Sequence, residues 1–325
     1  MLHAQHCIAS WKNTASANVR GYLRVKMTIQ PSKITPIHSK KNQFVFEQIH
    51  LDVARNATDD FNLFHNKNKW QTVRNNPFNG PILLGFQLEA FIIDKITELR
   101  SHENPTPKNT HLYDNYQFVF AGAIQPGDKF ELNINKTRNN ETKNSLSNRV
   151  YIKNDERLVI TGQKKDTDKP LYLRDAEFST LEELAPLPDK SLVLGGQYFM
   201  KKKFIMTSNA KNFLTGCLIE QSDYIDEVEN KVNFPSIFPC SFISSALLEK
   251  ARLEGINFSE NPSVYTQHKI SINNKEVNQL RSNSPLYILI ENKPFQENTQ
   301  LNCFGLTHSN NIVFRSIISL AEIGS

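Results

Sequence analysis

The length and composition of the chain limit the classes of protein it can belong to. At 325 residues it exceeds the usual size of one domain, and a norm of about 150 residues per domain predicts two. Hydrophobic residues at 39% and charged residues at 22% are typical of a globular protein and exclude wholesale disorder. The net charge of +5 is small and the basic residues are scattered, so nucleic acid is not indicated as a partner.

Neither a membrane segment nor a metal site is expected. No run approaches the roughly 18 apolar residues that a membrane-spanning helix needs. The four cysteines lie far apart, and none has a neighbour at the spacing of a metal ligand. We therefore predict free, buried thiols in a reducing cytoplasm, where we place the protein. The cysteines are Cys7, Cys217, Cys240 and Cys303.

Two segments differ in composition from the rest. The first 26 residues lack the apolar stretch of a secretory signal, and residues 1–40 are predicted to be a disordered extension. Residues 166–188 are rich in charge and proline, which is typical of a connecting segment. They separate a first unit at residues 41–170 from a second at residues 171–325.

The clearest predicted element is a helix from Gly80 to about Arg100. Apolar side chains cover nearly every face of its first two-thirds, and only the last turns are amphipathic. A helix that is apolar all round must be buried on all sides. Because this run is too short to cross a bilayer, a soluble fold has to wrap around it.

Strand signals follow this helix. Residues 116–123 are rich in β-forming types, residues 125–128 form a turn signal, and residues 129–137 alternate between apolar and polar. Residues 148–163 hold two more strand-like runs on either side of a turn at residues 154–155. One buried helix followed by an antiparallel meander is the pattern of a sheet curled around a helix.

The second half of the chain repeats this plan. A helix-like segment begins near Thr207, and a buried apolar run at residues 237–248 takes the place of the first core helix. Strand-like runs follow at residues 264–272, 286–290, 300–307 and 312–320. Two copies of one unit are the economical explanation. The predicted fold class is therefore α+β, with two tandem units that each wrap an antiparallel sheet around a central buried helix.

The residues that can carry chemistry lie just before the first core helix. Asp60, Asn62 and His65 follow the pattern D-x-N-x-x-H, and the segment GPILLG from Gly80 to Gly85 comes next. An Asp and a His five residues apart are common, and capping a helix is the simpler use of an Asp. Their coupling to a glycine-led apolar helix and a following meander instead favours an acid–base site.

This combination resembles the MaoC-like enoyl-thioester hydratases and dehydratases, which couple a D-x(4)-H segment to a glycine at the start of the hotdog helix. The resemblance covers roughly residues 42–165 and implies a double hotdog, one chain that contains the pseudo-dimer of single hotdog units. It implies that Asp60 is the general base, that His65 is its partner and that Asn62 orients one of the two.

The resemblance also implies an oxyanion site at the start of the helix. The backbone N–H at or near Gly85 would receive the thioester carbonyl oxygen, and Gly80 and Leu84 are the neighbouring substrate-binding positions. The chain departs from the family at Asp59, Leu63 and Leu84, where members usually carry Gly, Pro and often His. If Asp59 lies close to the catalytic carboxylate, it would raise the pKa of that group.

The second unit lacks the acid–base set. Cys217, Ile219 and Ser222 take the places of the motif's Asp, Asn and His. We expect this unit to support the fold and to shape an acyl pocket. His268 and His308 lie in strand-like runs without a carboxylate pattern, so a structural or exposed role is expected for both.

The functional expectation is a lyase that hydrates a 2-enoyl thioester or dehydrates a 3-hydroxyacyl thioester in fatty-acid or polyketide-type metabolism. Its substrate would be carried on coenzyme A or on the phosphopantetheine of an acyl carrier protein, without a further cofactor. A monomer with an internal pseudo-dimer and a homodimer both remain open. The alternatives are a hotdog acyl-thioesterase, which attacks the carbonyl, and a non-catalytic protein that binds an acyl thioester or a partner enzyme.

Overall fold

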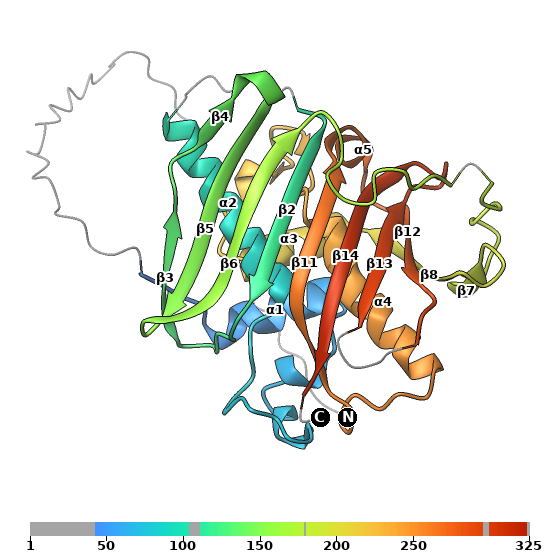
Figure 1. Cartoon of the computed structure of the whole chain (residues 1–325), viewed down its shortest axis with the longest axis horizontal. Coiled ribbons are helices and arrows are strands. Elements are labelled where there is room, and N and C mark those ends of the chain that lie inside the picture. The colour runs from blue at the N-terminus through green and yellow to red at the C-terminus, as the bar shows by residue number, and fades with distance from the viewer. Residues whose placement is uncertain (1–42, 104–110, 179, 295–298, 324–325) are drawn as a thin grey trace, which may run out of the picture. The chain divides into compact units, whose positions relative to one another are not determined.

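The computed structural model describes residues 43–103, 111–178, 180–294 and 299–323 (Figure 1). The extension predicted at residues 1–40 and Cys7 lie outside the described residues. Within the described ranges, no helix has both the length and the apolar character needed to cross a membrane.

The first half of the structure, residues 43–167, contains two long helices and a meander of strands. Its helices are α1 (Gln48–Thr58) and α2 (Gly85–Glu103), with short 3-10 turns η1 (Leu63–His65), η2 (Trp70–Thr72) and η3 (Glu141–Lys143). Its strands are β1 (Gln43–Val45), β2 (Tyr113–Phe120), β3 (Lys129–Ile134), β4 (Arg138–Asn140), β5 (Ser145–Asn154) and β6 (Arg157–Thr167).

The second half, residues 190–322, has the same succession of elements. Its helices are α3 (Thr207–Gly216), α4 (Phe238–Leu253) and α5 (Asn274–Gln279), with the 3-10 turn η4 (Gln221–Asp223). Its strands are β7 (Lys190–Val193), β8 (Tyr198–Ile205), β9 (Ile225–Asp226), β10 (Lys231–Val232), β11 (Ser263–Asn273), β12 (Ser284–Glu291), β13 (Gln300–Leu306) and β14 (Ile312–Glu322).

Both halves contribute to one antiparallel sheet. Among the described residues its strand order is β1-β3-β5-β6-β2-β11-β14-β13-β12-β8-β7, with β4 paired to β5. From the central β2–β11 pair, the strands of the first half follow outward as β6, β5, β3 and β1, and those of the second half as β14, β13, β12 and β8. Each strand of one series has its counterpart at the same place in the other. The predicted duplication of one unit is thus confirmed, and the fold class is α+β as expected.

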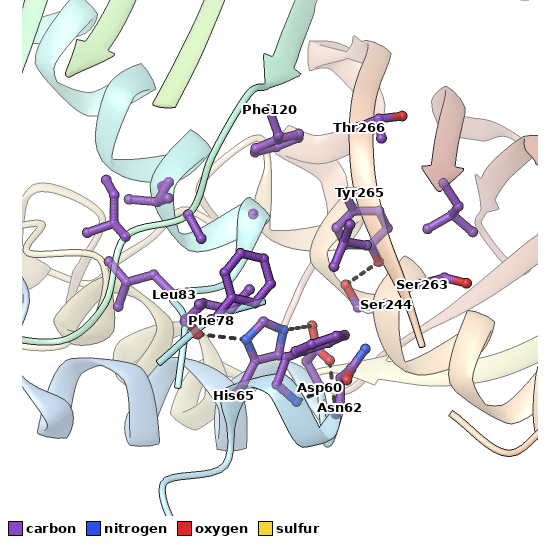
Figure 2. A pocket seen from close by; sticks show the side chains of 18 of the residues that line it. Asp60, Asn62, His65, Phe78, Leu83, Phe120, Ser244, Ser263, Tyr265 and Thr266 are labelled. Carbon is purple, nitrogen blue, oxygen red and sulfur yellow. Dashed lines mark hydrogen bonds and ion pairs between the residues drawn. The ribbon is translucent and has the colours of Figure 1, made fainter. Parts of the chain in front are cut away.

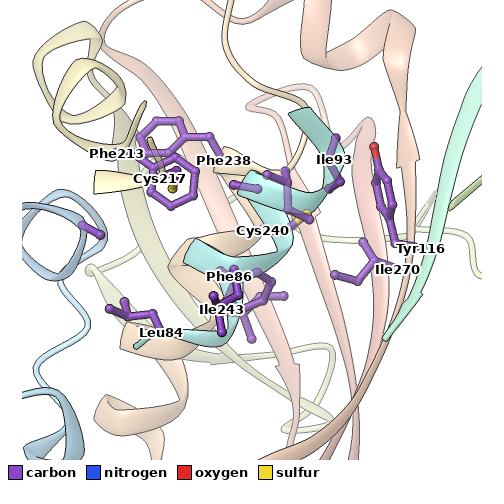
Figure 3. Close-up of a cluster of buried hydrophobic side chains, with 14 of the residues drawn as sticks. Leu84, Phe86, Ile93, Tyr116, Phe213, Cys217, Phe238, Cys240, Ile243 and Ile270 are labelled. Atoms are coloured by element: carbon purple, nitrogen blue, oxygen red, sulfur yellow. The ribbon is translucent and has the colours of Figure 1, made fainter. Parts of the chain in front are cut away.

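The helices α1 to α4 lie on one face of the sheet, where α1 packs on α3 and α2 on α4 (Figure 1). Figure 3 shows how the apolar sides of α2 and α4 meet: Phe86 and Ile93 from α2 lie near Cys240 and Ile243 from α4. The sheet covers one side of α2 and α4 covers another. This explains why the sequence of α2 is apolar on nearly every face. The prediction of free, buried thiols is confirmed for Cys217, Cys240 and Cys303.

The connecting segment covers the other face of the second half's sheet. Phe178, Leu181 and Leu184 pack against Met200 of β8 and Phe304 of β13. The backbone N–H groups of Leu171 and Tyr172 in this segment both donate to the hydroxyl of Ser271 at 3.1 Å. The composition of this segment predicts a linker, and its few apolar side chains attach that linker to the sheet.

Three elements differ from the sequence expectations. Helix α2 begins at Gly85 rather than Gly80, so residues 80–84 lead into the helix instead of belonging to it. Strand β8 was not predicted, because its three consecutive lysines, residues 201–203, do not resemble a strand in sequence. In the structure Lys201 and Lys203 form ion pairs with acidic side chains, which allows the strand to form. Strand β6 extends to Thr167, inside the segment expected to be a linker, because Lys164 and Asp166 are buried as an ion pair of 2.9 Å.

Close packing of α1 on α3 depends on Gly216. A Cβ atom at this position would lie 2.7 Å from the Cβ of Ala54 and 2.8 Å from its backbone nitrogen. Both are nearer than van der Waals contact, and the backbone cannot yield as a flexible side chain would.

We expect Gly216→Ala to lower the free energy of unfolding by about 1 to 3 kcal/mol, although alanine favours a helix, because the added methyl overpacks this contact. Urea unfolding measures the change. Gly122→Ala is the matched control, since its nearest neighbour would be 3.7 Å away. Equal stability of the two variants would contradict the packing argument.

A second prediction concerns Asp94 of α2, whose burial, opposed by Lys95 at 3.2 Å, raises the pKa of its carboxyl group to about 6. A folded-state pKa above the unfolded value stabilises the protein at low pH, and this contribution is lost as the pH rises from 4 to above 6. The free energy of unfolding of the wild type should therefore fall by about 2 to 3 kcal/mol between pH 4 and above pH 6 because of this group, and we expect Asp94→Asn to lack this fall. Urea unfolding at several pH values tests this, and parallel curves for the variant and the wild type would contradict it.

Candidate active site

The end of α1 directs Asp60 inward. Asp59 adopts a left-handed conformation with φ of 53°, and the N–H groups of Asp59 and Asp60 both donate to the carbonyl of Arg55. This turn leaves Asp60 only 2% exposed. The carboxylate of Asp59 points elsewhere and pairs with Lys203 of β8 at 2.9 Å. The two neighbouring carboxylates therefore have separate environments.

Asn62 builds the short turn that carries His65. Its side-chain oxygen accepts a hydrogen bond from the N–H of Phe64 at 3.2 Å, which caps η1. Its own N–H donates to Asp60 Oδ1 at 3.4 Å. Asn62 thus contacts the carboxylate of Asp60 with its backbone N–H and caps the turn that carries His65 with its side chain.

A hydrogen bond to the main chain sets the orientation of His65. Its Nδ1 lies 2.8 Å from the carbonyl oxygen of Ile82, which can only accept, so Nδ1 carries the hydrogen. In the neutral ring, Nε2 is then an acceptor, and it lies 3.8 Å from Asp60 Oδ2 (Figure 2). That distance is too long for a direct hydrogen bond. Two hydrogen-bond acceptors, His65 Nε2 and Asp60 Oδ2, are therefore close enough for one donor molecule to contact both.

Asp60 and His65 line a cavity of about 260 Å³. Figure 2 shows Asp60, Asn62 and His65 together on one side of the cavity, with Phe120 and Thr266 on the far side. Most of the remaining lining is apolar and comes from both halves: Phe64, Phe78, Ile82, Leu83, Leu88 and Ile124 from the first, and Leu247, Leu248, Phe258, Val264 and Leu320 from the second. The cavity suits a molecule with an apolar chain and one polar end.

Gly85 brings the start of α2 to this cavity. A Cβ atom here would lie 3.2 Å from the ring of Phe120 and 3.4 Å from that of Tyr265, so a side chain would enter the space between the rings. The first N–H groups of a helix have no intrahelical acceptor and carry partial positive charge. The arrangement can receive a developing negative charge on a ligand oxygen.

The other two residues assigned to substrate binding do not line the cavity. Gly80 lies against Gln125, whose side-chain oxygen would be 2.6 Å from an added Cβ atom. Leu84 is buried in the core, and its N–H donates to the side chain of Gln87. Since the helix begins at Gly85, the positions before it belong to the incoming chain, and of these Ile82 and Leu83 line the cavity together with Gly85.

The second half supplies a hydroxyl pair that the sequence did not indicate. Ser244 of α4 and Tyr265 of β11 share a hydrogen bond of 2.7 Å, and both line the cavity (Figure 2). Burial, and next the carboxylate of Asp60, raise the pKa of Tyr265 well above its usual range, so its hydroxyl stays protonated. No motif marks these residues, because they lie 21 positions apart in a half without the acid–base pattern.

The positions that replace the motif in the second half are structural. Cys217 and Ile219 belong to the apolar core, and burial raises the pKa of the Cys217 thiol well above its usual range. The hydroxyl of Ser222 hydrogen-bonds to Glu220. Among the described residues, these positions do not form a second acid–base pair.

A buried hydrogen bond between side chains joins the halves behind the cavity. Nδ1 of His268 in β11 lies 2.8 Å from Oε1 of Glu89 in α2, and both side chains are 0% exposed. The rings of Phe86, Phe120 and Tyr265 surround the imidazole with centroid distances of 4.7, 5.0 and 4.4 Å. The structural role expected for His268 agrees with this position, but its carboxylate partner comes from the other half of the chain.

Comparisons with known proteins place the fold. No protein-family model matches the chain, and no curated protein sequence does either. A MaoC-like dehydratase superposes with a TM-score of 0.58 over 87% of this chain and 97% of its own, at 9% identity. A putative MaoC domain dehydratase from Chloroflexus aurantiacus gives a TM-score of 0.51 at 10% identity over 89% of this chain and 97% of its own.

The chain has the double hotdog fold. The peroxisomal multifunctional enzyme type 2 of Drosophila melanogaster superposes with a TM-score of 0.50 and 10% identity over 86% of this chain and 48% of that protein. The similarity is one of backbone arrangement. The chemistry of the cavity is inferred from its own side chains.

The pair that joins the halves leads to a prediction about stability. We expect Glu89→Ala to lower the free energy of unfolding by about 3 to 5 kcal/mol, because it leaves the buried His268 without its partner. Glu89→Gln keeps an acceptor oxygen at the same place, so we expect a smaller loss. Urea unfolding compares the two, and equal losses would show that the hydrogen bond to His268 does not matter.

Proposed function

We propose that the cavity adds water to a 2-enoyl thioester, or removes it from a 3-hydroxyacyl thioester, which makes the chain an enoyl-thioester hydratase or dehydratase. One observation carries the proposal: two buried acceptors, Asp60 Oδ2 and His65 Nε2, lie 3.8 Å apart and face one largely apolar cavity. The backbone double hotdog shared with MaoC-like dehydratases supports it.

The geometry suits a water molecule as nucleophile. A water that donates one hydrogen to Asp60 and the other to His65 has its lone pairs directed away from both, into the cavity. The bond from His65 Nδ1 to the Ile82 carbonyl keeps Nε2 free for this contact. The carboxylate takes one proton as the oxygen adds to the β-carbon of the substrate, and the pair returns a proton to the α-carbon. Transfers of this kind contribute about 10²- to 10⁴-fold in rate.

The start of α2 is placed to stabilise the negative charge that the reaction develops on the thioester oxygen. Addition at the β-carbon places negative charge on the thioester oxygen as an enolate, and an N–H group near Gly85 would stabilise it. One such donor is worth about 10²- to 10³-fold in rate in other enzymes. Because residue 85 has no side chain, the thioester can approach the helix backbone between Phe120 and Tyr265.

The apolar part of the cavity would hold the acyl chain, and its lining from both halves explains why the second half is present without an acid–base pair. We propose coenzyme A or an acyl carrier protein as the carrier, with fatty-acid or polyketide-type metabolism in the cytoplasm as the setting. The chemistry requires no further cofactor.

The rival functions differ in their products. A thioesterase would use the same pocket but release a free acid, and a non-catalytic protein would bind the thioester unchanged. The convergence of Asp60 and His65 on one point supports hydration over hydrolysis, because two acceptors can together hold the water that would add to the β-carbon, whereas attack on the carbonyl needs only a single carboxylate.

Incubating the purified protein with crotonyl to dodecenoyl thioesters on both carriers, followed by mass spectrometry, tests the proposal. We expect a gain of one water with the thioester intact. Free acid would replace the proposal with a thioesterase, and no change despite measurable binding would replace it with a binding protein.

Asp60→Asn tests the assignment of the base. We expect kcat to fall by about 10²- to 10⁴-fold while the protein stays folded, because the amide cannot accept the proton. Asp59→Asn is the matched control, as it changes the adjacent carboxylate that pairs with Lys203. Undiminished turnover in a folded Asp60→Asn variant would remove Asp60 from the mechanism.

A further inference from the structure

A β-bulge in the second half of the chain turns Tyr265 toward the cavity of the acid–base pair. In a regular strand alternate side chains share a face, so Tyr265 would lie on the face opposite to His268. Between Tyr265 and Gln267, however, the pairing of β11 with β14 shifts by one residue. The ring of Tyr265 therefore lies on the same side as His268, with the ring centroids 4.4 Å apart. Bulges beside active sites often re-aim a side chain in this way.

Three contacts from different elements hold Tyr265 at the cavity wall. One edge of its ring is 3.4 Å from the place that a Cβ atom of Gly85 would take. The imidazole of His268, which is itself fixed by the 2.8 Å bond to Glu89, packs against the ring at an angle of 74°. The phenolic oxygen lies 2.7 Å from the hydroxyl of Ser244 on α4. The side chain is thus held by its edge, its face and its hydroxyl group.

The hydroxyl pair retains one hydrogen for a ligand. Two hydroxyl groups carry two hydrogens, and the bond between Ser244 and Tyr265 uses one of them. Among the described residues, neither hydroxyl has another hydrogen-bond partner. Burial, and next the charge of Asp60, raise the pKa of Tyr265 well above its usual range, so the phenol stays a donor. When Ser244 donates to Tyr265, it strengthens the bond that Tyr265 donates onward.

The place of the phenol in the cavity selects its acceptor. Tyr265 contacts Gly85 with one edge of its ring, and its hydroxyl end is directed to the side of the cavity where Asp60 lies (Figure 2). In the proposed reaction the thioester oxygen lies at the start of α2 and the β-carbon lies beside Asp60 and His65. Among the reacting atoms between these two points, only the thioester oxygen accepts hydrogen bonds. A donor to the attacking water would instead oppose the attack, because it would occupy the lone pair that adds to the β-carbon.

We propose that Tyr265 is a catalytic residue whose hydroxyl donates a hydrogen bond to the thioester oxygen, together with the backbone N–H at the start of α2, and that Ser244 positions this hydroxyl. The proposal rests on the proposed hydration and deepens it, since the enolate oxygen then has two donors. The first half supplies the acid–base pair and the second half supplies a donor for the developing charge. The phenol stabilises that charge without giving up its proton.

Kinetics of Tyr265→Phe test the role, because the variant keeps the ring and loses only the hydroxyl. We expect kcat for a 2-enoyl thioester to fall by about 10²- to 10³-fold with little change in KM. Tyr172→Phe is the matched control, since Tyr172 is also a partly buried, hydrogen-bonded phenol but does not line the cavity. Ser244→Ala leaves the phenol in place without its partner, so we expect a smaller fall in kcat. Melting temperatures show that the variants are folded.

An absorption measurement detects the hydrogen bond itself. The probe is a hexa-2,4-dienoyl thioester on coenzyme A and on acyl carrier protein, bound to the Asp60→Asn variant so that no turnover occurs. A hydrogen bond to its carbonyl oxygen polarises the conjugated system and moves the absorption to longer wavelength. We expect this shift to decrease when Tyr265→Phe is added and to stay the same when Tyr172→Phe is added. A tyrosine that only supports the cavity wall would leave the shift unchanged.

The inference is overturned if Tyr265→Phe keeps the kcat of the wild type, or if kcat falls while the absorption shift remains. Loss of the shift in Ser244→Ala but not in Tyr265→Phe also overturns it, because the donor would then be Ser244. When the wild type hydrates thioesters, these results remove the role of Tyr265 and leave the proposed function intact. A wild type that neither binds nor hydrates the thioesters removes both.

Discussion

The backbone pairing of β2 with β11 is the interaction on which the rest of the structure depends. It joins the sheets of the two halves edge to edge, with Tyr116 opposite Ile270 and Phe118 opposite His268. Because each half ends its sheet at this strand, the pairing brings α2 and α4 together on one face. Neither helix could bury its apolar surface without the other, since each is apolar on more sides than its own sheet covers.

The same pairing explains why a site in the first half has a wall from the second. Strand β11 runs past the start of α2, so Tyr265 lies beside Gly85 and hydrogen-bonds to Ser244 of α4. Asp60 and His65 come from one half and much of the apolar lining from the other. A half that lacks the motif is therefore still required for a complete cavity.

The sequence was sufficient for features that depend on local pattern. The apolar run of α2, the meander after it and the spacing of Asp60 to His65 could all be read from neighbouring residues. Position 60 points inward because Asp59 takes a left-handed turn, and position 65 is oriented by the carbonyl of Ile82. The motif predicts which residues matter, but these two main-chain features set their geometry.

Features that depend on contacts between distant segments could not be predicted in this way. Glu89 and His268 are 179 positions apart, and each alone is an ordinary polar residue in an apolar element. The start of α2 was misplaced because GPILL is as apolar as the helix that follows. Lys203 of β8 shows the related failure for strands: its charge suggests exposure, whereas it is buried against Asp59.

The Glu89–His268 pair has a consequence for the history of the chain. An assembly of two first halves would contain two copies of Glu89 and no His268, and an assembly of two second halves would contain the reverse. In either case a buried charge or imidazole would lose its partner, which is strongly unfavourable. The halves have thus become unlike subunits that are compatible only in a one-to-one ratio, and their fusion in a single gene product guarantees that ratio. A return to a symmetric homodimer would require compensating changes in both halves at once.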